Sequence, residues 1–214
     1  MQESENALLG EGCIIEEGAV VGHHYHEDAG KAVLGKHSIV RRGSIIYGDV
    51  EFGDYFQTGH HAIVRAQVRG GDHCCIFHNV VLEGMITLGT GVRLMAGVYL
   101  PSRTTIGNDV FLGPGVQVLN DTLASRYETM PTPQGPSIED DVVVGGGCIL
   151  LPGIRIGQGS FIAAGTLVTK DIPPESLVMG HPGKIQPLPE NLRRPNCRDL
   201  TRAKWDIWHP GRPL

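Results

Sequence analysis

Several histidines stand where an imidazole could move a proton near neutral pH. His60, His61 and His78 lie in short polar stretches between apolar residues, and Asn79 directly follows the last of them. An imidazole titrates close to neutrality, which suits a general base that takes a proton from an attacking group. His78 is the first candidate for such a base. His60 is the alternative base or a contact to a substrate hydroxyl, and either ring could instead be a surface histidine that hydrogen-bonds a neighbour.

Charged side chains that could orient a reacting group show the same spacing as the two candidate bases. Arg65 and Glu83 are eighteen residues apart in the sequence. We interpret Glu83 or Asn79 as the group that orients the base or the acceptor. His61 and Arg65 are interpreted as substrate contacts. Arg65 and Glu83 could equally form an ion pair with a structural role.

A short histidine-rich segment, GHHYHEDAGK at residues 22–31, raises the question of a metal site. Zinc sites are built from His, Cys and carboxylate ligands at characteristic spacings. This segment has neither a cysteine nor a spaced partner. We therefore expect no metal, and we interpret His24 and His26 as contacts to an acceptor substrate or as solvated side chains.

A six-residue repeat accounts for most of the chain and must position these side chains. From Leu34 to Val118, every sixth residue except Thr58 and Gly70 is aliphatic or aromatic. A second slot, four residues after each of these, is nearly always small or β-branched. Glycine, aspartate and asparagine crowd the positions between the slots, and these residues tolerate the positive φ of tight turns. A helix would need a period of about 3.6 residues and would not tolerate so much glycine.

The period predicts an all-β fold, a parallel β-helix. Each hexad is expected to form a short strand and a corner, and three hexads close a triangular coil of about eighteen residues. The slots predict eight such coils. Residues eighteen apart must then stack, which places His60 under His78. The repeat is interrupted at residues 22–33 and 119–137, and these segments are predicted to be loops that select the acceptor.

The five cysteines indicate neither a disulfide framework nor a zinc ribbon. The chain contains no CxxC pair and is large enough to need no cross-links. Cys13, Cys74 and Cys148 fall in inward slots, which predicts that they are core residues. Cys75 and Cys197 are left as the candidates for exposed thiols.

Charge and hydropathy disfavour several other classes of protein. The 214 residues carry a net charge of −5, which argues against a nucleic-acid partner. The N-terminus has no basic region, and no apolar run approaches the ~18 residues that a membrane span needs. We therefore expect a cytoplasmic protein that has no signal peptide and does not interact with a membrane.

Three segments match a known family: ITLGTGVRLMAGVYLPSRTTIGNDVFLGPGVQVLND, GGGCILLPGIRIGQGSFIAAGTLVTKDIPP and VMGHPGKI. They resemble the hexapeptide-repeat acyltransferases, and within them the branch that N-acetylates sugars on nucleotide carriers. The resemblance covers about residues 9–185. It implies a left-handed β-helix and a homotrimer, with acetyl-CoA as co-substrate in the groove between neighbouring columns. The acceptor, a small molecule such as a nucleotide sugar, would meet it at the subunit boundary.

The resemblance also implies which residues hold the cofactor. They are Gly145, Gly146, Ala163, Ala164, Lys170 and Lys184. The first four are corner residues in pairs eighteen apart, and their small side chains would let pantetheine reach backbone amides. The two lysines would meet the 3′-phosphate. Small corners could also merely suit tight turns, and exposed lysines could simply be solvated.

The second loop combines one further site prediction with a departure from the family. Asn120 and Asp121 open this loop, where relatives place acceptor contacts, although an Asx turn would use the same residue types. Many relatives carry a catalytic histidine in this loop, and none occurs here. A base must therefore come from elsewhere or be unnecessary. The family's usual Gly-Asn-Pro-Ala ending is also replaced by GHPG at residues 180–183.

These observations predict a β-helix acyltransferase domain over residues 1–186. A tail over 187–214 would pack on the last coil, with a short helix anchored by Trp205 and Trp208. The leading function is CoA-dependent acetyl transfer to an amino group of a sugar or sugar nucleotide. The alternatives are an O-acetyltransferase, a zinc enzyme of the γ-carbonic-anhydrase type, for which His73 and His78 have suitable spacing, and a catalytically silent scaffold.

Overall fold

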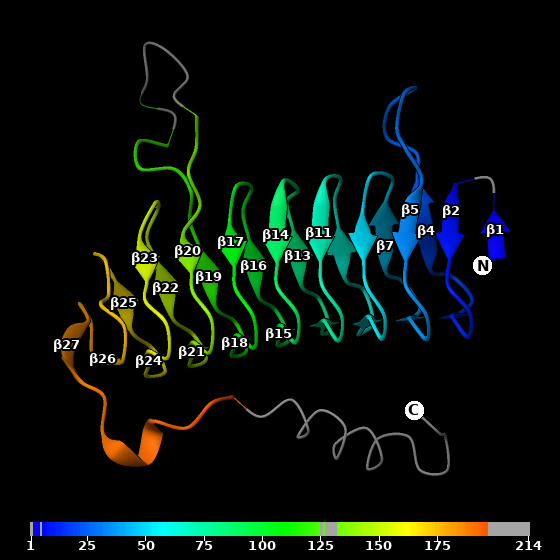
Figure 1. The fold of residues 1–214 in the computed structure, drawn as a ribbon. Helices are drawn as coiled ribbons and strands as arrows, with labels where there is room; N and C mark the ends of the chain where they lie inside the picture. Colours follow the sequence, from blue (N-terminus) through cyan, green and yellow to red (C-terminus); the bar gives the residue numbers. More distant parts are fainter. Residues whose placement is uncertain (1, 5, 125, 127–131, 197–214) are drawn as a thin grey trace.

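The computed structural model describes residues 2–4, 6–124, 126 and 132–196. Short strands and tight corners alternate along the chain, which winds into a column with one sheet on each of its three sides (Figure 1). Strands β2 to β25 form eight coils of three strands each, as the repeat predicts. The parallel register joins residues eighteen positions apart, for example Ile63 with Val81 and Val81 with Tyr99.

The three sheets run the length of the column. The first sheet consists of β1 (Gln2–Ser4), β2 (Ala7–Leu9), β5 (Ala32–Leu34), β8 (Glu51–Phe52), β11 (Val68–Gly70), β14 (Ile86–Leu88), β17 (Thr105–Ile106), β20 (Ser137–Ile138) and β23 (Arg155–Ile156). The second sheet consists of β3 (Ile14–Ile15), β6 (Ile39–Val40), β9 (Gln57–Thr58), β12 (Cys75–Ile76), β15 (Arg93–Leu94), β18 (Phe111–Leu112), β21 (Val143–Val144), β24 (Phe161–Ile162), β26 (Ser176–Met179) and β27 (Lys184–Pro187). The third sheet consists of β4 (Val20–His23), β7 (Ile45–Tyr47), β10 (Ile63–Val64), β13 (Val81–Leu82), β16 (Tyr99–Leu100), β19 (Gln117–Val118), β22 (Ile149–Leu150) and β25 (Leu167–Val168).

The corners form three edges along the column. The first edge joins the first sheet to the second, the second edge joins the second sheet to the third, and the third edge leads into the next coil. Both predicted loops leave the column at the third edge, after β4 and after β19 (Figure 1). Because of these loops, paired residues of neighbouring coils are farther apart in the sequence there, as in Ala7 with Ala32 and Thr105 with Ser137. The two interruptions of the repeat are therefore insertions at one edge.

The inward slots form one continuous apolar core, and the structure explains both exceptions to the repeat. A Cβ at Gly70 would lie 2.2 Å from the ring of Phe52, so this ring fills the space that an aliphatic side chain would occupy. Phe52 also stacks on Phe56, with ring centroids 3.9 Å apart. Thr58 keeps its hydroxyl satisfied inside the column, where Oγ1 accepts a hydrogen bond from the Arg41 amide at 2.8 Å.

The prediction for the cysteines is correct for Cys74 and Cys148, correct only in part for Cys13, and wrong for Cys75. Cys74 and Cys148 are fully buried, and Cys13 is half-buried. Cys75 was expected to be exposed, yet only 5% of it is accessible. Its neighbours in register are Gln57 and Arg93, two long side chains that can cover a short one. Burial raises the pKa of the Cys75 thiol to about 11, so this is not a reactive surface thiol.

The described part of the tail returns along the first edge. It contains the 3-10 helix η1 (Glu190–Leu192), and Leu188 is buried. Asn196 donates hydrogen bonds to the carbonyl of Asp109 at 2.7 Å and to the Asp141 carboxylate at 3.2 Å. The predicted helix with its two tryptophans, like Cys197, lies outside the described residues. Among the described residues, no helix is long and apolar enough to cross a bilayer.

Candidate functional site

The two candidate bases stack on each other at the second edge. The ring centroids of His60 and His78 are 5.4 Å apart, with 16° between the ring planes. The His60 backbone N–H donates a hydrogen bond to Nδ1 of His78 at 2.9 Å. The eighteen-residue coil thus places the second histidine directly over the corner of the first, as the repeat predicts.

His61 and Asn79 complete this group of polar side chains. Both have positive φ, 57° and 55°, because they occupy the tight second position of the corner. The Asn79 amide donates to the carbonyl of His60 at 3.0 Å, which ties the two corners together. All four side chains of the group are exposed. The second edge therefore presents His60, His61, His78 and Asn79 on one patch of surface.

His78 is held in its neutral form. Partial burial lowers the pKa of His78, and the neighbouring His60, Arg41 and His61 lower it further. A neutral imidazole carries one N–H and one lone pair. Because Nδ1 accepts the amide of His60, the proton of the neutral ring is on Nε2.

Arg65 and Glu83 pair with each other and lie away from the histidines. Both follow strands of the third sheet, so they approach the third edge, and the Arg65 guanidinium donates to the Glu83 carboxylate. The side chains are 50% and 30% exposed. The Glu83 carboxylate raises the pKa of Arg65, and burial together with Glu83 raises the pKa of Tyr99 beside it. Within one chain, Glu83 thus orients Arg65.

The predicted acceptor contacts in the second loop have structural partners. Asn120 donates from Nδ2 to the hydroxyl and the carbonyl of Ser102, at 3.1 Å and 3.2 Å. Oδ1 of Asp121 accepts the amides of Leu123 and Ala124, both at 2.9 Å, which is an Asx turn at the start of the loop. These bonds fix the direction in which the loop leaves the column.

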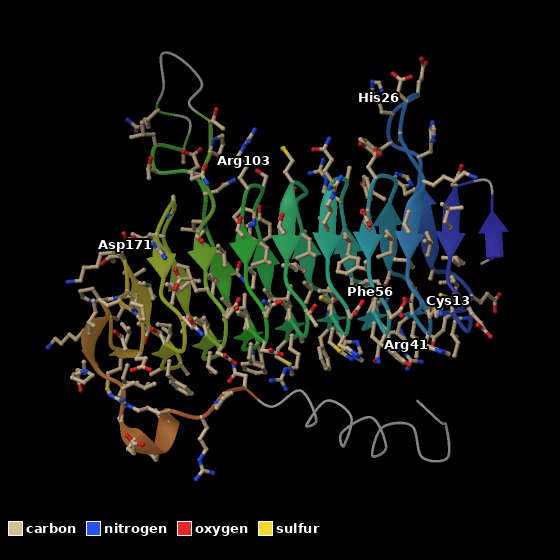
Figure 2. The ribbon with its side chains drawn as sticks, viewed as in Figure 1. Cys13, His26, Arg41, Phe56, Arg103 and Asp171 are labelled. Carbon is tan, nitrogen blue, oxygen red and sulfur yellow. The ribbon has the colours of Figure 1, made fainter. Side chains whose placement is uncertain are left out.

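The first loop carries His24 and His26 as exposed side chains. The Tyr25 hydroxyl donates to the Asp49 carboxylate at 2.8 Å, which anchors the loop to the next coil. Figure 2 shows His26 at the tip of this loop, on the side of the column opposite Arg41, which lies beside the stacked histidines. One chain therefore does not bring the loop histidines to the second edge.

Small residues occupy the second edge above the histidines. A Cβ at Gly145 would lie 2.4 Å from the amide nitrogen of Ala164, and one at Gly113 would lie 2.5 Å from that of Gly146. Because these glycines have no side chain, the backbone amides of Ala164 and Gly146, one coil above them, stay uncovered. Within the described residues, the amides of Gly146 and Ala164 have no hydrogen-bond acceptor. Sequence reasoning missed Gly113, although its spacing from Gly145, lengthened only by the second loop, could have identified it.

The remaining predicted cofactor residues lie near the end of the column. Ala163 stacks over Gly145 and is half-buried. Lys170 is exposed after β25, a strand of the third sheet, so it lies toward the third edge of its own chain, whereas Lys184 is exposed in β27 of the second sheet. Bare amides suit the carbonyls of a pantetheine arm, and Lys184 suits a phosphate. The geometry therefore fits a CoA thioester along the upper second edge.

The two histidines proposed as zinc ligands lie at different edges. His73 is at the first edge, where its ring stacks on Tyr55 with centroids 4.8 Å apart. His78 is at the second edge, with its Nδ1 already bonded. Across the described ranges, no group of three or more His, Cys, Asp or Glu side chains is placed to hold a metal ion.

Sequence comparisons match the repeat and short stretches of the chain. Residues 135–170 match the family model for the bacterial transferase hexapeptide (six repeats). A protein of Schizosaccharomyces pombe, provisionally named an acetyltransferase, is 56% identical over 48 residues, which are 22% of this chain and 23% of that protein. The 2,3,4,5-tetrahydropyridine-2,6-dicarboxylate N-acetyltransferase of Staphylococcus aureus is 42% identical over 55 residues, 26% of this chain and 23% of that enzyme. The matched stretches span less than a quarter of the length of these curated relatives.

Solved structures match over almost the whole chain. The Arabidopsis UDP-N-acetylglucosamine acyltransferase has a TM-score of 0.64 and 16% identity, over 99% of this chain and 82% of that one. The enzyme of Bacteroides fragilis has a TM-score of 0.59 and 15% identity, over 98% and 84% of the two chains. Likeness at this level of identity concerns the fold. Residues 135–170 thus match the hexapeptide transferase repeat, and the chain as a whole has the fold of the left-handed parallel β-helix acyltransferases.

Proposed function

We propose that this protein is a CoA-dependent acyltransferase that moves an acetyl group onto an amino group of a sugar or sugar nucleotide. The observation that carries the proposal is the composition of the second edge. Its upper coils leave the amides of Gly146 and Ala164 uncovered, and its lower coils present His60 and His78. A pantetheine arm bound to the amides and extended along this edge would carry its thioester toward the histidines.

The reaction requires little chemistry from the protein itself. Acetyl-CoA supplies an activated acyl group, and the acceptor nitrogen forms a bond to the acyl carbon while the carbon–sulfur bond breaks. The protein must orient the two reactants and donate hydrogen bonds where negative charge develops on oxygen. The polar side chains at the second edge are available for this. The N-acetyltransferase among the relatives supports an amine acceptor, and a hydroxyl acceptor is the alternative.

We propose further that the active form is a homotrimer. Apolar side chains cover the outer faces on both sides of the second edge. They are Ile14, Phe111, Val143 and Phe161 on the second sheet and Val20, Ile45, Ile63, Val81, Tyr99, Ile149 and Leu167 on the third. Val20 is 43% exposed and Ile14 is 41% exposed, which is unfavourable in an isolated column.

A second copy would also complete the site. The histidines lie at the second edge, whereas Arg65, Glu83 and both loops lie at or near the third edge of the same chain. A neighbouring copy that packs its third edge against the second edge would bring His24, His26, Asn120 and Asp121 toward the histidines. Acceptor selection by these loops is therefore a property of the assembly.

Three measurements on the purified protein test the proposal. Millimolar CoA is expected to raise the Tm of thermal unfolding, and acetyl-CoA with a panel of amino and hydroxyl sugar nucleotides is expected to release free thiol with the amino members. Sedimentation is expected to give the mass of a trimer. A Tm that CoA does not raise would contradict CoA as the donor's carrier. Thiol release only with hydroxyl acceptors would contradict an amine acceptor. Stoichiometric zinc together with carbon dioxide hydration would favour the γ-carbonic-anhydrase alternative.

A further inference from the structure

The corner that holds His78 also fixes which of its nitrogens is free. At the second edge, the backbone amide at the first corner position points out of the sheet ladder and needs a separate acceptor. In the second coil, this amide belongs to Arg42 and donates to Oε2 of Glu16 at 3.0 Å. In the third coil, it belongs to His60 and donates to Nδ1 of His78 at 2.9 Å.

The first edge shows that this is a general device of the fold. There the amides of Lys36 and Asp54 donate to the carboxylates of Asp54 and Asp72, at 2.7 Å and 2.8 Å. Each acceptor comes from the residue eighteen positions later, as His78 does for His60. Nδ1 of His78 therefore has the place of a carboxylate or amide oxygen and serves as the acceptor that caps a corner amide.

This use of Nδ1 is incompatible with a base at Nε2. A neutral imidazole that accepts at Nδ1 carries its proton on Nε2. For Nε2 to accept a proton, the ring must first move its own proton to Nδ1, which then faces the N–H of His60. The cap would be lost and two donors would oppose each other.

We propose that His78 acts as a hydrogen-bond donor through Nε2–H to an oxygen of the bound reactants, the thioester carbonyl above all, and not as a general base. This inference rests on the acyl transfer proposed above and replaces the base role expected from the sequence. In the reaction, the acceptor enters as a neutral amine and its nitrogen bonds to the acyl carbon. The proton that it loses goes to water or to the departing thiolate, and His78 stays neutral throughout.

Other groups around the ring agree with a neutral donor. The titratable and charged side chains that face His78 are His60, His61 and Arg41, and each of them lowers the pKa of His78. Partial burial acts in the same direction. Arg41 is itself paired with Glu16, which holds it beside the stacked rings. Among the residues that the structure describes, no carboxylate is bonded to His78 to stabilise an imidazolium.

Two variants of one residue separate the possible roles. His78→Gln places an amide N–H near the position of Nε2 but removes the cap, whereas His78→Asn places Oδ1 near the position of Nδ1 and removes the outer donor. A donor to a developing oxyanion contributes about 10²-fold to kcat. We therefore expect His78→Asn to lose about a hundredfold in kcat and His78→Gln to lose less than about tenfold. His73→Gln, at the first edge, is the matched control and is expected to keep wild-type rates.

Each other outcome overturns the proposal. Equal, large losses in both variants would indicate a base, because neither amide can accept the proton. Full activity of His78→Asn, with a lower Tm for His78→Gln, would mean that His78 only caps the His60 amide and has no role in the reaction.

A spectroscopic readout is independent of activity. Nitrogen-15 NMR of histidine-labelled protein at pH 8 is expected to show a protonated Nε2 and an unprotonated Nδ1 for His78. A proton on Nδ1 would refute the donor assignment even if the variants behaved as expected. If the wild-type protein transferred no acyl group, the proposed function would fail together with the role of the donor, but the spectrum would still decide whether Nδ1 caps His60.

Discussion

The first and second edges are built from the same corner, and they treat its outward amide differently. At the first edge, side chains cap this amide in most coils. The capped amides are those of Lys36, Asp54, Thr90, Asn108 and Gln158, with acceptors on Asp54, Asp72, Asn108, Asp140 and Glu139. At the second edge, Arg42 and His60 are capped. Further up, Pro114 has no N–H, and within the described chain the amides of His78, Ala96, Gly146 and Ala164 have no acceptor.

The difference separates structural corners from corners that can bind a ligand. A Cβ at Gly53 would lie 2.0 Å from the Asp72 carboxylate, so at the first edge a side chain already fills the space over the glycine. A Cβ at Gly145 would instead meet backbone atoms of Ala163 and Ala164. A Cβ at Gly35, at the first edge, would also meet backbone atoms of Gly53 and Asp54, so close approach of the coils is common to both edges, and the difference lies in whether a side chain caps the outward amide.

The largest expected effect comes from filling the uncapped edge. Ala164→Leu places a bulky side chain over the amides that would bind pantetheine, and we expect it to weaken CoA binding about a hundredfold, or ~2.8 kcal/mol. Isothermal titration with CoA measures this. Gln158→Leu is the matched control, because it changes the corresponding corner of the same coil at the first edge. An unchanged affinity in Ala164→Leu, or equal losses in both variants, would contradict a ligand site at the second edge.

A smaller effect is expected from removing a cap at the first edge. Asp54→Ala leaves the Lys36 amide without its acceptor, and we expect a loss of ~1 kcal/mol in the free energy of unfolding. Asp54→Asn should retain almost all of the stability, because Asn108 caps Thr90 in the same geometry at 2.9 Å. Denaturant titration of both variants provides the comparison. CoA affinity should stay at the wild-type value in each, and a weakened affinity would mean that the two edges are not independent.

The fold can be predicted almost completely from the sequence, because each coil repeats the same short-range pattern. An error in assigning one coil therefore does not affect the assignment of the next. Stacking of residues eighteen apart follows from that pattern, and it correctly places His60 with His78 and Arg65 with Glu83. The edge to which a residue belongs also follows from its position in the hexad, and it separates the histidines from Glu83, which we interpret from the sequence as orienting the base or the acceptor. They lie at opposite ends of the third sheet's strands.

The protonation state of His78 could not be read from the sequence. It depends on which ring nitrogen faces the His60 amide, a contact between two coils that residue types alone do not determine. Cys75 shows the same limit, because it is buried although it faces outward, beside the long side chains of Gln57 and Arg93 in register. The repeat predicts which residues point inward and leaves open what covers those that point outward.

The smallest expected effect is a difference in pH dependence between the two capped corners of the second edge, at Arg42 and His60. The pKa of His78 is lowered in the folded chain, so its contribution to stability is complete above the unfolded pKa of about 6.5 and declines as the pH falls toward the folded value. The pKa of Glu16 is also lowered, chiefly by the Arg42 amide and then by Arg41, so its contribution is lost only below about 4.5. On acidification, the His78 cap is lost only as the pH falls through the lowered pKa of folded His78, and the Glu16 cap only as the pH falls through the lowered pKa of Glu16, so the two caps should be lost at different pH values.

Amide hydrogen exchange, corrected for intrinsic rates, measures this difference. In a series that runs from pH 7.5 down to pH 5, we expect the protection of the His60 amide to fall about fivefold where His78 becomes protonated, while that of Arg42 is unchanged there. His78→Asn should abolish the pH dependence at His60, because an amide oxygen caps without titrating. Equal loss at both amides would point to general loosening of the lower coils, and constant protection at His60 would mean that protonation leaves the cap intact. Either result would remove the distinction between the two caps on which the neutral donor depends.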